Sequence, residues 1–174
     1  MHNLYYATKN ILDYTVHIAS NQRGLVAVGL EESQEDFIGE LKKDFSNSRI
    51  VYNEEKNHLP IQQITEYFQG TRRQFDLSLD IMGTSFQRRV WEALLTIPYG
   101  KVVAYKDIAI EIGNAKAGRA VGLANKKNKI PIIIPCHRVI GVNGSLVGYD
   151  GGLDLKKKLL ALEGVKIVKE KVGI

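Results

Sequence analysis

Two short runs near the start of the chain have the polarity pattern of β-strands. Residues 14–19 alternate between polar and apolar positions, and residues 25–30 form an apolar run. Both contain β-branched side chains, which are favoured in strands. Residues 21–24, Asn-Gln-Arg-Gly, are typical of a turn. The pattern therefore predicts two neighbouring strands joined by a tight connection.

Apolar residues at helical spacing follow these strands and predict two helices. The first begins near Ser33, with acidic residues in its first turn and an apolar face of Phe37, Ile38, Leu41 and Phe45. The second has Pro60 near its start, Gly70 beyond its end, and an apolar face of Ile61, Ile64, Tyr67 and Phe68.

Residues 75–79 alternate again and predict one more strand, with Phe75, Leu77 and Leu79 on one side. Strands mixed with helices predict a small α/β unit. Its three histidines are scattered along the sequence and assemble no recognisable catalytic cluster; they are His2, His17 and His58.

A new pattern begins at Gly83. Thr84 and Gln87 have the spacing of a capping box, in which each side chain satisfies a backbone amide of the other residue. Residues 98–101, Pro-Tyr-Gly-Lys, end the predicted helix, and residues 102–104 are short and extended. The apolar stripe of this helix comprises Phe86, Val90, Leu94 and Ile97, with Trp91 beside it.

Two short helices are predicted next, joined by Gly113-Asn114. Residues 106–112 form the first, in which we expect Ile108, Ala109 and Ile112 to be buried. Residues 117–125 form the second and are rich in Ala and Gly. This arrangement is typical of a helix-turn-helix, although an ordinary helical hairpin gives the same pattern. The small residues, together with the flanking Arg119, Lys126 and Lys127, favour a helix that approaches DNA closely.

The last third of the chain combines an apolar segment, a turn and a helix. Residues 131–135 predict a rigid extended segment, and Asn143-Gly144 favours a type I′ hairpin turn between residues 139–140 and 146–147. Residues 153–162 predict a final helix that ends at Gly164. We expect the lysine-rich tail after Val165 to be frayed.

Composition limits the class of protein. The chain has 174 residues, 44% of them hydrophobic, which is enough for a packed core. No apolar run approaches the roughly 20 residues that span a bilayer, and no targeting segment opens the chain, so we expect a soluble cytoplasmic protein without membrane partners. The net charge of +5 divides into −4 for residues 1–82 and +9 for residues 83–174. The basic half suits a phosphate backbone, although a lysine-rich solvated surface would have the same charge.

Cys136 is the chain's single cysteine, which excludes an internal disulfide and a zinc site built from several thiolates. A lone cysteine is commonly a small core residue. Here Pro135 precedes it, and His137 and Arg138 follow it. Cationic and hydrogen-bonding neighbours lower a thiol's pKa and make it a better nucleophile. Because neighbours on an extended segment point to opposite sides, His137 would act through a turn or a bridging water.

Residues 135–139, Pro-Cys-His-Arg-Val, resemble the active-site motif of the O6-alkylguanine-DNA alkyltransferases (methylated-DNA–protein-cysteine methyltransferases). The resemblance runs from Gly83 to Val165 as an ordered series of motifs at consistent spacing. Its other members are residues 83–87, 98–102, 119–122, 148–149, 151–152 and 159–164.

The resemblance implies the roles of the reacting residues. Cys136 would accept the alkyl group from O6 of guanine in one irreversible step after the base is flipped from the duplex. Transfer from O4 of thymine stays open. His137 would act as its base through water, and Glu163 would orient His137. Asn128 matches the family's hinge asparagine, and Tyr105 matches the tyrosine that promotes nucleotide rotation and protonates the departing guanine.

The same resemblance implies a DNA-binding surface and a substrate pocket. Arg119 matches the arginine that fills the gap left by the extruded base, and Ala120, Gly122, Lys126, Lys127 and Tyr105 belong to the same surface. Asp150 occupies a position where the family commonly has serine or another small residue, and we hypothesise that it alters substrate preference. The implied pocket residues are Val139, Val147, Gly148, Tyr149, Asp150 and Gly151.

The expected fold is α/β: a small N-terminal domain with an antiparallel sheet and helices, ribonuclease H-like, in residues 1–82, and a mainly helical domain with a winged helix-turn-helix in residues 83–174. We expect a monomer that binds double-stranded DNA containing O6-alkylguanine, uses no cofactor and holds no metal. Cooperative binding along DNA stays open. The alternatives are a lesion sensor without transfer activity, a cysteine hydrolase using Cys136 and His137, and a transcription regulator.

Overall fold

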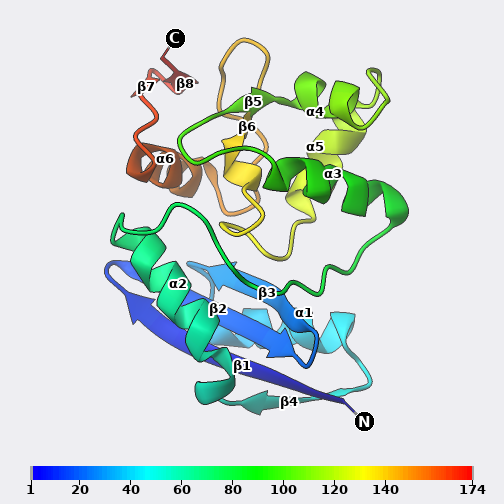
Figure 1. Ribbon diagram of the computed structural model, residues 1–174, viewed down its shortest axis with the longest axis vertical. Coiled ribbons are helices and arrows are strands. Elements are labelled where there is room, and N and C mark those ends of the chain that lie inside the picture. The colour runs from blue at the N-terminus through cyan, green and yellow to red at the C-terminus, as the bar shows by residue number, and fades with distance from the viewer. Residues whose placement is uncertain (1, 174) are drawn as a thin grey trace. The chain divides into compact units, whose positions relative to one another are not determined.

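The computed structural model describes residues 2–173. The chain forms two compact units that divide between Ile81 and Met82, one residue before the boundary expected from the sequence. Figure 1 shows a sheet with helices in the first unit and mainly helices in the second. No helix within the described residues is long and apolar enough to cross a bilayer.

The first unit is built on a four-stranded sheet in the order β3-β2-β1-β4. The sheet is mixed rather than wholly antiparallel, because β4 runs parallel to β1 while the other pairs are antiparallel. The two strands expected from the sequence, β2 and β3, are confirmed. The four strands are β1 (His2–Ile11), β2 (Tyr14–Asn21), β3 (Gly24–Leu30) and β4 (Ser48–Tyr52).

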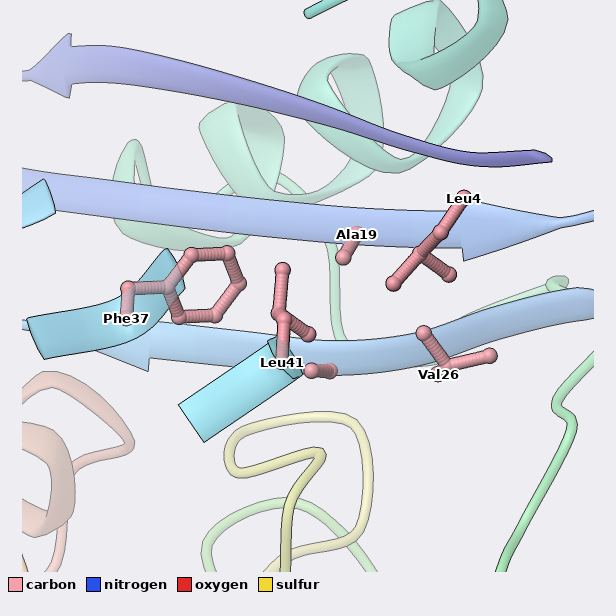
Figure 2. Close-up of a cluster of buried hydrophobic side chains, with 6 residues drawn as sticks. Leu4, Ala19, Val26, Phe37 and Leu41 are labelled. Atoms are coloured by element: carbon pink, nitrogen blue, oxygen red, sulfur yellow. The ribbon is translucent and has the colours of Figure 1, made fainter. Parts of the chain in front are cut away.

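Two helices cover opposite faces of this sheet (Figure 1). The first, α1 (Gln34–Asp44), begins as expected at Ser33, whose hydroxyl accepts from the Asp36 amide. Figure 2 shows its Phe37 and Leu41 in a cluster with Leu4, Ala19 and Val26. The second, α2 (His58–Phe68), follows a short 3₁₀ turn, η1 (Glu55–Asn57).

Aromatic contacts fix the face that each helix covers. Phe37 of α1 stacks on His17, with ring centroids 5.3 Å apart, and Phe68 of α2 stacks on Tyr14 at 4.2 Å. Tyr14 and His17 are separated by three positions on β2, so their side chains point to opposite faces of the sheet. The single sheet therefore lies between two apolar layers.

The strand expected at residues 75–79 is absent. This segment makes one isolated bridge to the sheet, between Leu25 and Leu79. The amide of Leu25 donates to Ser78 O at 2.9 Å, and the Asp80 amide donates to Leu25 O at 2.9 Å. Phe75, Leu77 and Leu79 are all half-buried, which explains the alternation, but no ladder forms along the segment.

The second unit contains the four helices expected from the sequence. The capping box at the start of α3 is confirmed, since Gln87 N donates to Thr84 Oγ1 and Thr84 N donates to Gln87 Oε1. Trp91 of α3 donates through Nε1 to Ala124 O at 2.9 Å, which ties α3 to α5. The four helices are α3 (Ser85–Leu95), α4 (Tyr105–Glu111), α5 (Gly118–Lys126) and α6 (Leu153–Leu162).

Helices α4 and α5 are packed together as the helix-turn-helix pattern requires. Gly113 lies in the connecting turn with φ of +79°, a backbone conformation that favours glycine. Ile108 and Ala109 are buried as expected, whereas Ile112, at the end of α4, is only half-buried. The second unit also contains two small sheets: β5 (Val103–Ala104) with β6 (Val139–Ile140), and β7 (Ile167–Val168) with β8 (Lys171–Val172).

Three local expectations in this unit are wrong. Residues 131–135 form a compact turn instead of an extended segment, with Ile132 at φ +73° and Ile134 N donating to Ile130 O. Residues 139–140 pair with β5 rather than with residues 146–147. The turn at Asn143-Gly144 is not type I′, which needs positive φ at both central residues, because Gly144 has φ of +80° and Asn143 does not have positive φ.

The tail after Val165 is also more ordered than expected, because β7 and β8 form a hairpin. This hairpin is tied to the preceding loop, since Leu146 N donates to Glu170 O and Val172 N donates to Gly144 O. Ile167 and Val172 pack against a buried cluster. Their burial offsets the conformational entropy lost when the lysine-rich tail is ordered. The buried members of the cluster are Ile140, Leu146 and Leu160.

Candidate active site

Cys136 opens a short 3₁₀ turn, η2 (Cys136–Arg138), directly after the compact turn at residues 131–135. Its side chain is buried, with the residue 4% exposed. The Cys136 amide donates to Ile134 O at 2.8 Å, and its carbonyl accepts from Asn125 Nδ2 at 3.2 Å. The cysteine is therefore held by its own backbone in a tight turn and not on the extended segment that we expected.

Two asparagines connect the end of α5 to this turn. Asn128 donates through Nδ2 to Ile134 O at 2.8 Å and accepts from the Ile130 amide through Oδ1 at 2.9 Å. These contacts link the end of α5, the second helix of the helix-turn-helix, to the segment that leads into Cys136. Asn125 adds the second link, and the sequence interpretation missed it. The spacing of Asn125 and Asn128 at the end of a helix is the signal that could have identified the pair.

His137 and Glu163 form a buried pair, with Nε2 and Oε1 2.7 Å apart. Burial opposes ionisation of Glu163, but hydrogen bonds from His137 and Arg138 hold its pKa well below the usual value of 4.5. An ionised carboxylate only accepts hydrogen bonds, so Nε2 of His137 carries the proton and Nδ1 has the lone pair. Burial lowers the pKa of His137 below 6.5 despite Glu163, which makes the imidazole a neutral base at pH 7.

Arg138 completes the surroundings of the Glu163 carboxylate. Its Nε donates to Oε2 at 2.9 Å and its Nη2 donates to Oε1 at 3.0 Å, while Nη1 donates to Ile97 O at 2.6 Å. The Gly100 amide also donates to Oε2, at 3.0 Å. Each carboxylate oxygen therefore accepts two hydrogen bonds. The sequence interpretation treated Arg138 only as a nearby positive charge.

The Cys136 thiol is neutral at rest. Burial raises its pKa to about 11, against a hydrogen bond with Asn128 and the charge of Lys156, both of which lower it. The expectation that flanking cations depress this pKa is wrong, because desolvation of the thiolate outweighs them. A reaction at Cys136 therefore requires a base to remove the proton as the sulfur attacks, and His137 occupies the next position in the same turn.

Two tyrosines lie close to the thiol. Tyr105, the first residue of α4, donates through its hydroxyl to Val147 O at 2.9 Å, and burial raises its pKa to about 12. Burial, the charge of Cys136 and a hydrogen bond with Cys136 raise the pKa of Tyr149 well above 10.0. Both phenols keep their protons at neutral pH and can act as hydrogen-bond donors. Gly148, with φ of +68°, allows the loop to pass Tyr105, since a Cβ there would lie 3.1 Å from its hydroxyl.

Lys156 on α6 is a functional candidate that the sequence interpretation missed. It is 0% exposed, and its ammonium donates to Val139 O at 2.6 Å and to Val147 O at 3.0 Å. Its position between Leu155 and Leu159, on the buried face of a helix, is the signal that could have revealed it.

The remaining candidates are the residues expected to form a substrate pocket and those expected on the surface of α5. Val139 is buried, Gly148 and Tyr149 are half-buried, and Val147, Asp150 and Gly151 are exposed. Gly122 is half-buried beside Tyr105, whose ring carbon would lie 3.9 Å from an added Cβ. Side chains on the outer face of α5 and just beyond its end are exposed; they are Arg119, Ala120, Lys126 and Lys127.

A buried cysteine next to a histidine–glutamate pair, in the same compact unit as a helix-turn-helix, defines a class of proteins with a nucleophilic cysteine and a DNA-binding motif. Two family models match the chain in agreement with this class. Residues 85–165 match the DNA-binding domain of 6-O-methylguanine DNA methyltransferase, and residues 4–81 match its ribonuclease-like domain. The chain belongs to the 6-O-methylguanine DNA methyltransferase family.

Relatives with similar sequences are named as methyltransferases of methylated DNA. A methylated-DNA–protein-cysteine methyltransferase of Methanosarcina acetivorans is 45% identical over 161 residues, which cover 92% of this chain and 99% of that protein. The one of Mycolicibacterium paratuberculosis is 57% identical over 103 residues, which cover 59% of this chain and 62% of that protein. The match to this mycobacterial relative thus spans less than two thirds of its length.

Solved structures agree in fold over nearly the whole chain. The Mycobacterium tuberculosis O6-methylguanine methyltransferase superposes with a TM-score of 0.80 and 40% identity, covering 92% of each chain. The M. tuberculosis protein in complex with DNA superposes with a TM-score of 0.77 and 39% identity, covering 91% of this chain and 92% of that chain. The expected two-part fold, an α/β unit followed by a helical DNA-binding unit, is confirmed.

Proposed function

We propose that this protein repairs DNA by moving an alkyl group from O6 of guanine to the sulfur of Cys136, once per chain. The observation that carries the proposal is the buried neutral thiol beside the His137–Glu163 pair. The S–C bond forms as the O6–C bond breaks. The thiol proton leaves through His137, and the guanine gains a proton, so the products are an S-alkyl cysteine and an unmodified base.

The surrounding residues divide the work of this single step. His137 accepts the thiol proton through a water molecule at Nδ1, and Glu163 stabilises the imidazolium that forms. Tyr105 keeps its proton at neutral pH and donates to the departing guanine when its hydroxyl turns away from Val147 O. Asn128 and Asn125 hold the turn that presents Cys136. The alkyl group stays on Cys136 because the sulfur of an alkyl thioether is a poor leaving group, so each chain reacts once.

DNA is bound by α5, and the base must leave the duplex before its O6 substituent can reach a buried thiol. Ala120 and Gly122 let the helix approach closely, Arg119 fills the vacated position in the stack, and Lys126 and Lys127 contact phosphates. The pocket for the extruded base is formed by the backbone and side chains around residues 139 and 147–151. A protein that acts on this substrate must reach the cell's DNA. In a prokaryotic cell the DNA lies in the cytoplasm, so we expect the protein there.

The test is a mass measurement after incubation with duplex DNA containing O6-methylguanine. The intact protein is expected to gain one methyl group, which peptide mapping locates on Cys136, and the DNA to regain guanine. Cys136→Ser should bind the same duplex and gain nothing. A wild-type protein that gains no mass contradicts the proposal.

Binding and hydrolysis assays run beside the mass measurement separate the alternatives. Tight binding of the lesion without mass gain would indicate a sensor, and preference for one unmodified sequence would indicate a regulator. Repeated turnover of an ester or amide at Cys136 would indicate a hydrolase. The presence of the cysteine and of its histidine–glutamate pair favours transfer over sensing.

A further inference from the structure

We propose that Lys156 is a positioning residue of the alkyl-acceptor site, whose buried ammonium joins two backbone carbonyls around the pocket and stabilises the negative charge that develops on the Cys136 sulfur. This inference rests on the proposed function. Lys156 forms no bond to the alkyl group and takes no proton, since the thiol proton still leaves through His137.

The geometry places Lys156 where three parts of the site meet. Val139, whose carbonyl accepts from Nζ at 2.6 Å, directly follows the turn that contains Cys136. Val147, whose carbonyl accepts at 3.0 Å, lies in the pocket loop. The same Val147 carbonyl accepts from the Tyr105 hydroxyl at 2.9 Å, and Nζ lies 5.9 Å from the Tyr105 ring centroid. One ammonium thus connects α6, β6, the pocket loop and the start of α4.

Two backbone carbonyls do not by themselves require a charge. A neutral donor would satisfy them, whereas burial of an ammonium is costly unless an opposite charge is present or develops nearby. The charge that acts on Lys156 is that of Cys136. The other ionisable groups of this site are Tyr105, Tyr149, Asp150 and the hydrogen-bonded set of His137, Arg138 and Glu163. Of all these groups, Cys136 is the one that becomes negative in the proposed reaction.

The electrostatic effects of Lys156 and Cys136 are reciprocal. The ammonium lowers the pKa of the thiol, and a thiolate raises the pKa of the lysine. Burial lowers the pKa of Lys156 to about 8. The ammonium is therefore present at neutral pH, when the reaction needs it, and is lost in mildly alkaline solution.

The test compares rates of benzyl transfer from free O6-benzylguanine, a probe that needs no DNA binding. Lys156→Gln keeps an amide donor without the charge, and Lys158→Met removes an exposed lysine from the same helix as a control. We expect the ratio of the wild-type to the Lys156→Gln rate constant to be about tenfold or more below pH 8 and to fall toward one above it. The ammonium also lowers the pKa of the thiol and of His137, so the ratio carries those effects too, and all of them disappear when Lys156 loses its charge.

A ratio that does not change with pH overturns the proposal, as does a Lys156→Gln rate equal to that of the wild type. Thermal melting checks that the variant is folded. If it is not, the wild-type profile decides alone, because a profile without an inflection between about pH 7 and pH 9 overturns the proposal. Failure of the wild type to take methyl groups from DNA would instead contradict the proposed function.

Discussion

Arg138 holds Glu163 through two parallel hydrogen bonds of 2.9 and 3.0 Å, between side chains that are both buried. His137 competes for the same carboxylate at Oε1. The guanidinium keeps Glu163 ionised. The carboxylate therefore accepts a hydrogen bond from Nε2–H of His137, and the proton stays on the imidazole. The arrangement fixes the tautomer of His137 that the proposed transfer needs.

Replacing Arg138 with Met is expected to lower the free energy of unfolding by about 3–5 kcal/mol, because it leaves a buried carboxylate without its main partner. Urea unfolding measures this loss. Arg89→Met, which changes an exposed residue on α3, serves as the control and should stay within about 0.5 kcal/mol. A loss for Arg138→Met as small as that of the control would contradict the structural role of the pair.

Acid should destabilise the protein through Glu163. Its folded-state pKa lies below 4.5, so its contribution to stability is complete above the unfolded pKa and is lost as the pH falls toward the folded value. We expect the midpoint of urea unfolding to decrease below about pH 5 more steeply in the wild type than in Glu163→Gln. Equal slopes for the two proteins would show that Glu163 does not carry this dependence.

Arg119→Ala should slow repair of duplex DNA by about tenfold or more, because base extrusion costs a few kcal/mol that the arginine offsets by filling the stack. Reaction with free O6-benzylguanine should be unchanged, since no base is extruded. Lys116→Ala, which removes another exposed cation just before α5, controls for charge alone. Equal slowing of both reactions by Arg119→Ala would argue against the stack-filling role.

Asp150→Ser should change the ratio of rates for large and small O6-alkyl groups. Asp150 is exposed in the pocket loop, and its charge raises the pKa of the Cys136 thiol. Its removal favours the thiolate for every substrate, so a change in the ratio reports the shape and polarity of the pocket. Rates for O6-methylguanine and O6-benzylguanine measure this ratio, and an unchanged value would exclude Asp150 as a determinant of substrate preference.

The elements that sequence predicted well are those stabilised by local interactions. Helix α6 matches its expected range of 153–162, and α3 begins at the expected capping box, because side-chain periodicity and caps depend only on near neighbours. Strand β4 was missed because it pairs in parallel with β1, which is distant in sequence. Strand β1 was missed because its buried positions do not alternate regularly, although it forms a local hairpin with β2. The segment at 131–135 was misjudged because a short apolar run fits a buried turn as well as a strand.

The residues that react were identified through a sequence motif. The residues that hold them in place, Arg138 and Lys156, were not. Arg138 and Lys156 act on carboxylate and carbonyl oxygens that are distant in sequence, and nothing in their neighbours specifies those partners. The resting ionisation of Cys136 was also misjudged. Flanking charges are visible in the sequence, but the burial that outweighs them depends on the folded packing.

The central claim is that each chain accepts one alkyl group on Cys136 and no more. The direct test titrates the protein with an excess of duplex containing O6-methylguanine and counts the guanines restored at completion. We expect a plateau at one guanine per chain, matched by one methyl group on Cys136 and abolished in Cys136→Ser. Restoration of several guanines per chain, or full activity in Cys136→Ser, would contradict the account.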